Sequence, residues 1–334
     1  ALKNWQSISG WPIFADPLSG IDDDQEGLIS FWELLISSDF LSATSRTSRL
    51  NILRLGPLPS SRILANWLTK VKGNQVLISE GDKRYLDPLR ISSQWSYGLN
   101  AWVKNIFNSD SVQANSRKNK SIDLLNQLVS ADSYAKNWIS QKLNMQGQIT
   151  EPALAHWLPR RLPLNIQIML SASSPIRDWI SFGGKETLSR RCFGFRGASG
   201  IDGTLSLGMG LCIANGPTVL VTGDLALLHD SNGWLFSNSP GPPIVVLLID
   251  NGGGGIFQQL EIEKFVKGNL EDLFAMPQLI NPLALASCYD IPFRQISLLE
   301  DLEIAFEWAI SKNKPVLLRV CTSSYQDNKL RNSL

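Results

Sequence analysis

The stretch TVLVTGDLALLHDSNGWLFSNSPGPPIVVLLIDNGGGGIF (residues 218–257) decides the fold of this 334-residue chain. It predicts an apolar strand over 218–221, a helix-like segment over 225–236, a break at 240–243 and a second apolar strand over 244–249. Two uninterrupted apolar strands joined through a helix are typical of a parallel sheet that is buried on both faces. We therefore predict an α/β fold that binds its ligand at the carboxyl ends of these strands.

Oxygen-bearing residues follow both predicted strands. Gly223 and Asp224 end the first strand, and Asp250, Asn251 and the glycines 252–255 follow the second. Carboxylate, amide and backbone oxygens are ligands that Mg²⁺ accepts, and phosphate oxygens often complete its shell. Glycines let the backbone approach a phosphate closely. The residues thus predict a Mg²⁺-diphosphate site. The alternative is an ordinary β-α-β unit in which the Asp caps the helix and the glycines only form a turn.

Several segments of the sequence resemble those of a known protein family. A Gly-Asp pair followed by an Asn at the end of an apolar strand resembles the binding signature for thiamine diphosphate (ThDP). The words around it resemble the MenD family of 2-succinyl-5-enolpyruvyl-6-hydroxy-3-cyclohexene-1-carboxylate (SEPHCHC) synthases, of menaquinone and phylloquinone biosynthesis. They are FRGASGIDGTLSLGMG (195–210), GDLALLHDSNG (223–233), DNGGGGIFQQL (250–260) and FAMPQLINPLALA (274–286), preceded by WPIFADPLSG (11–20) and LGPLPSSR (55–62). They follow in order over nearly the whole chain.

The resemblance implies a reaction and a cofactor. A transferase of this family uses ThDP and Mg²⁺, which Mn²⁺ can replace. It decarboxylates 2-oxoglutarate and adds the resulting succinyl carbanion to isochorismate in a 1,4-addition that gives SEPHCHC. By matching the family motif, Asp224, Asn251 and the carbonyl of Gly253 are expected to bind the metal, and Gly223 to contact the cofactor.

The resemblance also implies residues around the reacting centre. Ile201 is expected to hold ThDP bent and Ser199 to offer its carbonyl to the cofactor, although Ile201 alone could be an apolar turn residue. Guanidinium forks suit the carboxylates of both substrates, although surface arginine is the alternative for each. The residues expected to bind substrate are Ser173, Arg177, Arg196, Arg62, Ile256, Phe257 and Leu260. Arg177 and Arg196 are also expected to be catalytic, together with Ile201. Ile256 is also expected to contact the cofactor. Ser61 stands where a lysine is expected, which weakens the case for Arg62.

Length and pattern predict two doubly wound, mainly parallel-sheet domains: a central Rossmann-like α/β domain over 1–147 and an α/β domain over 148–334, which the resemblance implies to be the ThDP diphosphate-binding domain. In the first domain we predict strands at 12–15, 51–55 and 75–79, helices at 60–71, 100–107 and 122–143, and a solvated loop at 116–121. In the second we predict a helix capped by Thr150, strands at 166–170 and 315–320, a helix at 299–311, and a loose polar tail after Thr322.

Composition argues against several classes of protein. The net charge is +1, so nothing indicates nucleic acid or a membrane surface, and no apolar run is long enough to predict membrane insertion. The first residues are largely polar, so we expect no signal peptide. Four scattered cysteines and two histidines make a zinc site improbable and favour buried thiols in a reducing cytoplasm.

The family's amino-terminal pyrimidine-binding domain, with its activating glutamate, has no counterpart in this sequence. We therefore expect the carboxy-terminal part of a larger enzyme, inactive alone, whose sites form between the subunits of a homodimer or homotetramer. Two alternatives stay open. One is another ThDP-dependent 2-oxo acid decarboxylase or synthase, and the other is a non-catalytic assembly module.

Overall fold

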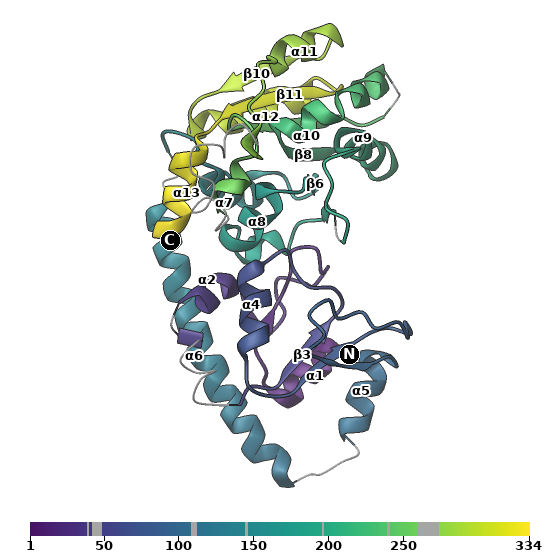
Figure 1. Ribbon diagram of the computed structural model, residues 1–334, viewed down its shortest axis with the longest axis vertical. Helices are drawn as coiled ribbons and strands as arrows, with labels where there is room; N and C mark the ends of the chain where they lie inside the picture. The colour runs from purple at the N-terminus through teal and green to yellow at the C-terminus, as the bar shows by residue number, and fades with distance from the viewer. Residues whose placement is uncertain are drawn as a thin grey trace. The chain divides into compact units, whose positions relative to one another are not determined.

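The computed structural model describes residues 1–38, 40–41, 49–107, 112–143, 146–195, 197–238, 241–259 and 274–334. Two compact units divide the chain: one is Ala1–Asp16 with Ile21–Trp138, and the other is Pro17–Gly20 with Ile139–Leu334. Both contain helices and parallel strands, so the predicted α/β class is confirmed (Figure 1). The domain boundary placed between 147 and 148 stays a prediction.

The first unit contains a three-stranded parallel sheet in the order β3-β4-β5 and a two-stranded parallel sheet, β1-β2. Its elements are α1 (Leu2–Ser9), β1 (Ile13–Phe14), β2 (Leu28–Ile29), α2 (Trp32–Ser37), β3 (Ile52–Leu55), α4 (Arg62–Lys70), β4 (Gln75–Ile78), β5 (Ser93–Trp95), α5 (Gly98–Phe107) and α6 (Val112–Lys142), which continues into the second unit. The prediction of a solvated loop at 116–121 is wrong, because these residues lie within helix α6. Its Arg and Lys residues are good helix formers.

Aromatic side chains pack the core of the first unit between β4, β5 and α5. Ile78, Leu99 and Val103 are buried there. Trp95 and Trp102 pack against them, edge to face, with ring centroids 5.5 Å apart. The helical spacing of Leu99 and Val103 places both on the face of α5 that covers the sheet.

The second unit is built on a six-stranded, wholly parallel sheet in the order β10-β11-β9-β8-β6-β7. Its elements are α7 (Glu151–Arg161), β6 (Gln167–Leu170), α8 (Ser174–Phe182), η1 (Lys185–Thr187), β7 (Cys192–Gly194), α9 (Thr204–Asn215), β8 (Thr218–Gly223), α10 (Asp224–His229), η2 (Ser231–Asn238), β9 (Ile244–Asp250), η3 (Gly255–Gln259), α11 (Pro282–Cys288), β10 (Phe293–Ile296), η6 (Leu299–Asp301), α12 (Leu302–Ser311), β11 (Val316–Cys321) and α13 (Ser324–Ser333). The order of the strands reverses at β6, where a doubly wound sheet opens a crevice for ligands.

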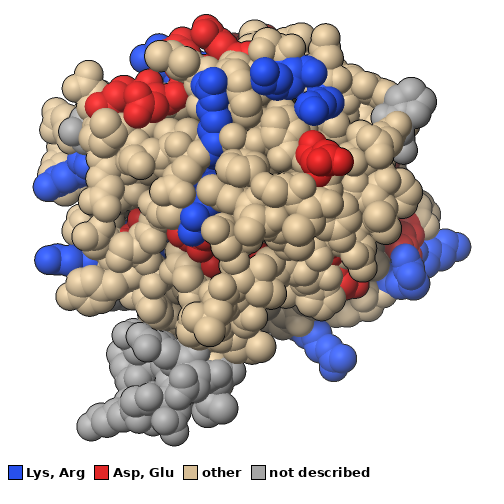
Figure 2. Space-filling model, turned by 90° about the horizontal axis from the view of Figure 1, so that it is seen from above, with Lys and Arg blue, Asp and Glu red and all other residues tan. Residues whose placement is uncertain are grey.

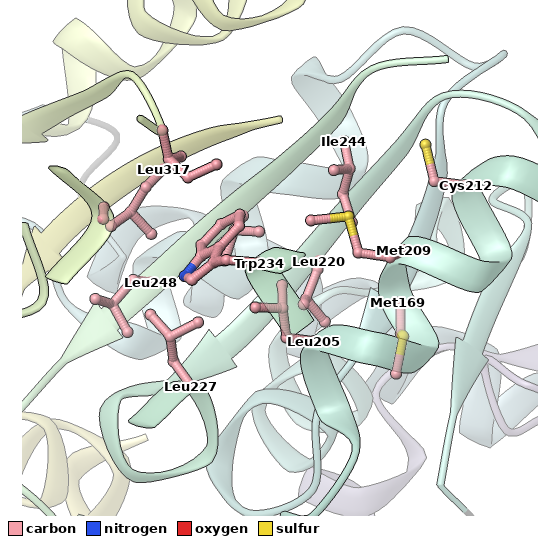
Figure 3. Packing of buried hydrophobic residues seen from close by; sticks show 13 residues of the cluster. Met169, Leu205, Met209, Cys212, Leu220, Leu227, Trp234, Ile244, Leu248 and Leu317 are labelled. Carbon is pink, nitrogen blue, oxygen red and sulfur yellow. The ribbon is translucent and has the colours of Figure 1, made fainter. Parts of the chain in front are cut away.

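One face of this sheet carries a continuous apolar row. Met169, Leu220, Val246 and Leu317 are aligned by strand register and almost fully buried. Helices α9 and α11 and segment η2, which supplies Trp234, cover them (Figure 3). Fully burying one such side chain stabilises the fold by about 2 kcal/mol. This packing fixes the strands whose carboxyl ends form the candidate site.

The structure departs from the sequence predictions in two places near that site. The helix expected over 225–236 breaks after α10, and η2 follows as a 3₁₀ segment. The break occurs where the Asp230 carboxylate accepts hydrogen bonds from the N–H and the hydroxyl of Ser206. The prediction of a loose tail after Thr322 is also wrong. The tail forms helix α13, which is capped by Ser323 and in which Asp327 is buried.

Uncharged residues make up most of the face shown in Figure 2. On the face in Figure 2, Lys and Arg side chains lie scattered among Asp and Glu. Among the described residues, the structure contains no helix with both the length and the apolar character needed to cross a membrane.

Candidate functional site

Strands β8 and β9 bring the predicted oxygen ligands to one edge of the sheet. They are parallel neighbours, and Gly223 pairs in register with Ile249. Both strands are buried until their last residue, Gly223 in β8 and Asp250 in β9, which is half-buried. Asp224 and Asn251 follow at once, so the sheet delivers both to the same carboxyl edge.

Asp224 is bonded at both carboxylate oxygens. Its Oδ1 accepts from the N–H of Leu225 and its Oδ2 from the N–H of Gly253, each at 2.7 Å. Burial nevertheless raises the pKa of Asp224 to about 6. The two backbone bonds oppose this increase, and the charge of nearby Asp250 adds to it. A carboxylate kept half-buried beside a second one is a suitable ligand for a cation.

The loop after β9 needs its glycines. Gly252 and Gly253 have φ values of +82° and +124°, which side chains rarely adopt. A Cβ on Gly253 would lie 2.2 Å from the carbonyl oxygen of Ala275, and one on Gly255 would lie 2.9 Å from Nδ2 of Asn251. Only glycine lets this backbone approach its neighbours so closely. The carbonyl of Gly253 accepts from the N–H of Gly255 and has a second lone pair for another partner.

Asn251 has one satisfied and one unsatisfied side-chain atom. Its Nδ2 donates to Oε1 of Glu151 at 2.6 Å. Its Oδ1 is buried and has no hydrogen-bond partner among the described residues. A buried acceptor without a donor is costly, and a missing ion is one reason for it. The amide oxygen, the Asp224 carboxylate and the glycine loop therefore fit a hard cation such as Mg²⁺.

Such a site differs from a cluster of strong side-chain ligands. Within the described ranges, no group of three or more His, Cys, Asp or Glu side chains is arranged to hold a metal ion. A cation at the strand ends would therefore depend on amide and backbone oxygens, and on oxygens of the ligand itself.

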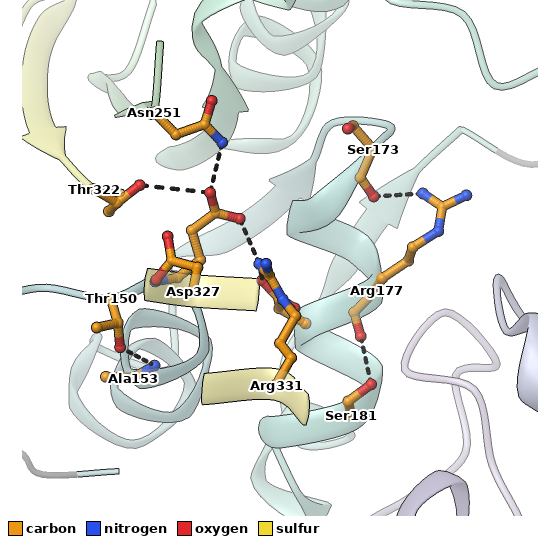
Figure 4. Close-up of polar contacts among 11 residues, drawn as sticks. Thr150, Ala153, Ser173, Arg177, Ser181, Asn251, Thr322, Asp327 and Arg331 are labelled. Carbon is orange, nitrogen blue, oxygen red and sulfur yellow. Dashed lines mark hydrogen bonds and ion pairs between the residues drawn. The ribbon is translucent and has the colours of Figure 1, made fainter. Parts of the chain in front are cut away.

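A group of charged side chains is connected to Asn251 through Glu151 (Figure 4). Its members are Glu151, Asp178, Asp327 and Arg331. Arg331 of α13 pairs with Oε2 of Glu151 at 2.6 Å and with both carboxylate oxygens of Asp178 in α8. Oδ1 of Asp327, one turn before Arg331, accepts from the backbone N–H of Glu151 at 3.0 Å. Burial, followed by the charge of Glu151, raises the pKa of Asp327 to about 7. This group connects α7, α8 and α13 to the metal-ligand candidate.

Ser173 and Arg177 lie at the carboxyl end of β6, as the sequence suggests. Ser173 has φ +79°, an uncommon value for a residue other than glycine and one that indicates local strain. Its carbonyl accepts from Nη1 of Arg177 at 2.5 Å, and the carbonyl of Arg177 accepts from the hydroxyl of Ser181 (Figure 4). Strain of this kind is concentrated at functional sites.

The other residues predicted for the second unit differ in their exposure, and two of them lie outside the described residues. Ser199 is exposed and Ile201 half-buried, in the turn before α9. Ile256 and Phe257 are half-buried in η3, where the Phe257 and Phe274 rings are 5.5 Å apart. Arg196 and Leu260 lie outside the described residues.

Arg62 belongs to the first unit, where it is the exposed first residue of α4. Ser61, found where the family resemblance leads one to expect a lysine, caps this helix. Its hydroxyl accepts from the N–H of Leu64 at 3.0 Å. The serine therefore has a structural use that a lysine could not supply.

Comparison with known proteins agrees with this geometry. Residues 185–320, which include β8 and β9, match the model of the thiamine pyrophosphate enzyme, C-terminal TPP binding domain. Over its whole length the chain is 52% identical to the 2-succinyl-5-enolpyruvyl-6-hydroxy-3-cyclohexene-1-carboxylate synthase of Prochlorococcus marinus (strain MIT 9313), of which it covers 57%. Over its whole length the chain is therefore similar to SEPHCHC synthases, and residues 185–320 match a thiamine pyrophosphate-binding domain.

Other SEPHCHC synthases are similar to this chain to nearly the same extent. The synthase of Parasynechococcus marenigrum (strain WH8102) is 51% identical, and that of Synechococcus sp. (strain CC9902) is 48% identical, each over the whole of this chain. The chain covers 58% and 57% of these two proteins. It thus spans a little more than half the length of the synthases that it matches.

Sequence reasoning missed two residues beside the candidate site, Glu151 and Arg331. A signal for the helix that carries Arg331 was present. Ser323 and Gln326 have the spacing of a capping box, and Ser323 does accept from the N–H of Gln326. Asp327 and Arg331 are then four residues apart, which places both on one face of a helix.

Proposed function

We propose that Asp224, Asn251 and the carbonyl of Gly253 bind Mg²⁺, or Mn²⁺ in its place, and through it the diphosphate of ThDP. The observation that supports this most is the buried Oδ1 of Asn251, at the strand end beside Asp224, for which the described residues supply no donor. Gly223 and the glycine loop would let the diphosphate approach the backbone. Mg²⁺ would neutralise the diphosphate charge next to two carboxylates.

The reaction that we propose for the whole protein is the synthesis of SEPHCHC from 2-oxoglutarate and isochorismate, in menaquinone or phylloquinone biosynthesis. Bound ThDP would supply the electron sink for loss of CO₂ and for addition of the succinyl unit. Ile201 would support the cofactor in a bent conformation, with the Ser199 carbonyl near its amino group. Ile256, Phe257 and Leu260 would form an apolar wall that excludes water.

The substrates carry carboxylates, and arginines suit them. Arg177 and Arg196 would bind these groups with two hydrogen bonds each. The Ser173 carbonyl holds Arg177 at the end of β6, which would orient its guanidinium toward the strand ends. Arg62 is also proposed to bind a substrate carboxylate. Ser61 weakens this last assignment, since it provides no second positive charge.

Catalysis is proposed to need a pyrimidine-binding domain whose glutamate activates the cofactor. That domain would come from the rest of the protein or from another subunit of a homodimer or homotetramer. A cytoplasmic location and inactivity of the 334-residue chain alone also stay predictions.

The test is an assay with ThDP, Mg²⁺, 2-oxoglutarate and isochorismate. We expect the whole protein to form SEPHCHC and its Asp224→Ala variant to form none, because the variant lacks a metal ligand. Decarboxylation of pyruvate in place of 2-oxoglutarate would instead indicate another 2-oxo acid decarboxylase or synthase. Self-association without any binding of ThDP and Mg²⁺ would indicate an assembly module.

A further inference from the structure

We propose that Glu151 is a positioning residue that fixes the orientation of the Asn251 amide, and that Arg331 of the carboxy-terminal helix holds Glu151 in place. The inference deepens the proposed function and rests on it, because it takes Oδ1 of Asn251 as a metal ligand. It brings into the site two residues that do not themselves touch the metal.

The orientation follows from the chemistry of the two groups. A carboxylate oxygen only accepts hydrogen bonds, so it selects the NH₂ end of the amide. Nδ2 of Asn251 accordingly faces Oε1 of Glu151 at 2.6 Å. The reverse orientation would place two oxygens against one another. Glu151 thereby leaves Oδ1 as the end of the amide that is available to a cation.

The contact also favours the amide oxygen as a ligand. Donation of the N–H to a carboxylate polarises the amide and increases the negative charge on its oxygen. Partners that orient metal ligands in this way typically change metal affinity by about 10- to 100-fold when they are removed. The position of Glu151 therefore affects both the geometry and the strength of the Asn251 ligand.

Glu151 is itself held rigidly. Its side chain is 2% exposed, and it is the first residue of α7, which Thr150 caps. Oε2 pairs with Arg331, while Oε1 also lies 3.5 Å from the hydroxyl of Thr322, just after β11. A carboxylate fixed at both oxygens can hold the amide in one orientation.

Stability alone is a weak reason for this arrangement. A buried ion pair often stabilises a protein no more than an apolar pair of the same size. Here one guanidinium, that of Arg331, serves two carboxylates, while Asp327 brings a third close to Glu151. Such an excess of buried negative charge costs stability, but it surrounds the residue that orients a metal ligand.

The test compares Glu151→Gln with Asp178→Asn. Both changes remove one charge from a buried partner of Arg331, but only Glu151 has a hydrogen bond to Asn251 among the described contacts. The first readout is the Asn251 side-chain amide signal in ¹H–¹⁵N spectra of the 334-residue chain, assigned by its loss in Asn251→Asp. The second is the affinity for Mn²⁺ in the presence of ThDP.

We expect a downfield Asn251 amide proton in the unmodified chain, as for donation to a carboxylate. Glu151→Gln should move this signal and weaken Mn²⁺ binding by about tenfold or more. Asp178→Asn should leave the signal in place and change the affinity by less than about threefold. If Glu151→Gln does not fold, Arg331→Lys replaces it, and we expect the same signal to shift and the affinity to fall by a smaller factor.

An Asn251 amide signal with the shift of a solvent-exposed amide in the unmodified chain would overturn the inference without any variant. Equal effects of Glu151→Gln and Asp178→Asn on the signal would overturn it as well, because the group would then act only on the fold. Failure of the proposed function is a different result. It would appear as a downfield amide signal that responds to Glu151→Gln in a protein that binds no Mn²⁺ and ThDP.

Discussion

Each unit of the chain buries a carboxylate against an arginine, and the two groups differ in how their acceptors are satisfied. In the first unit, Nη1 of Arg54 pairs with Asp87 at 2.8 Å, and backbone N–H groups and the Ser92 hydroxyl complete both oxygens of Asp87. In the second unit, Arg331 pairs with Glu151 and Asp178, yet Oδ1 of Asn251 and Oδ2 of Asp327 have no described partner.

The difference is what we expect between a structural group and the functional site that we propose. Burial raises the pKa of Asp87, but its hydrogen bonds from Ser92 and Arg54 outweigh this and leave the pKa well below the usual range. In Asp224, burial outweighs the backbone bonds, and the pKa is raised. Hydrogen bonds thus dominate the pKa of Asp87, whereas burial dominates that of Asp224, where we propose that a cation binds.

The largest loss of stability is expected for Asp87→Ala. Removing one partner of a buried pair leaves Arg54 unpaired and costs about 3–5 kcal/mol. Hydrogen exchange should show this loss in β3, β4 and β5, while the affinity of folded protein for Mg²⁺ and ThDP stays within about twofold. Loss of affinity as large as that in Asp224→Ala would break the distinction between the two groups.

A smaller loss of stability is expected for Gly253→Ala. The added Cβ would meet the Ala275 carbonyl, and the backbone φ of +124° would be strained, at a cost of about 1–3 kcal/mol. Because the loop must shift, the binding free energy of Mg²⁺ and ThDP should fall by more than the free energy of unfolding does. Gly210→Ala in α9 is the control, because its Cβ would meet nothing within 4 Å. Equal effects of both variants on calorimetric affinity would contradict the role of the loop.

The pH dependence of stability should change in Asp327→Asn. The pKa of Asp327 is raised to about 7 from 3.8, so the folded chain binds this proton more tightly than the unfolded chain. Its contribution to stability is therefore full below pH 4 and is lost as the pH rises to about 7. The melting temperature should fall less between pH 5 and 8 in the variant than in the unmodified chain. Identical slopes would show that Asp327 does not hold the proton.

The smallest effect on stability is expected for Ile201→Ala. Ile201 is half-buried in a turn, so its truncation should cost about 1 kcal/mol. Its proposed place is under the cofactor, so the rate of SEPHCHC formation by the whole protein should fall much more than the affinity for ThDP. An unchanged rate would remove Ile201 from the catalytic set.

The sequence predicted the carboxyl ends of β8 and β9 because each is a local pattern. An apolar strand, a Gly-Asp pair and a run of glycines lie within a few residues of one another, and strand register then brings them together. The same reasoning could not place Glu151 beside Asn251, which lies 100 residues away, or beside Arg331, which lies 180 residues away. Long-range contacts between polar residues leave no periodic signal.

Two further features were not predicted from the sequence, each for a physical reason. The polarity of the tail after Thr322 indicated a loose segment, but two of its polar side chains, Asp327 and Arg331, are partners of the buried Glu151. The left-handed φ of Ser173 could not be predicted, since only glycine makes such a conformation visible in a sequence.

The measurement that tests the account most directly is a calorimetric titration of ThDP, with and without Mg²⁺, into the chain and its Asp224→Ala and Asp87→Asn variants. We predict Mg²⁺-dependent binding by the unmodified chain and by folded Asp87→Asn, and none by Asp224→Ala. Binding that is independent of Mg²⁺ or retained in Asp224→Ala would contradict the assignment. So would the absence of binding by the unmodified chain, because the ends of β8 and β9 would then be insufficient to hold the diphosphate.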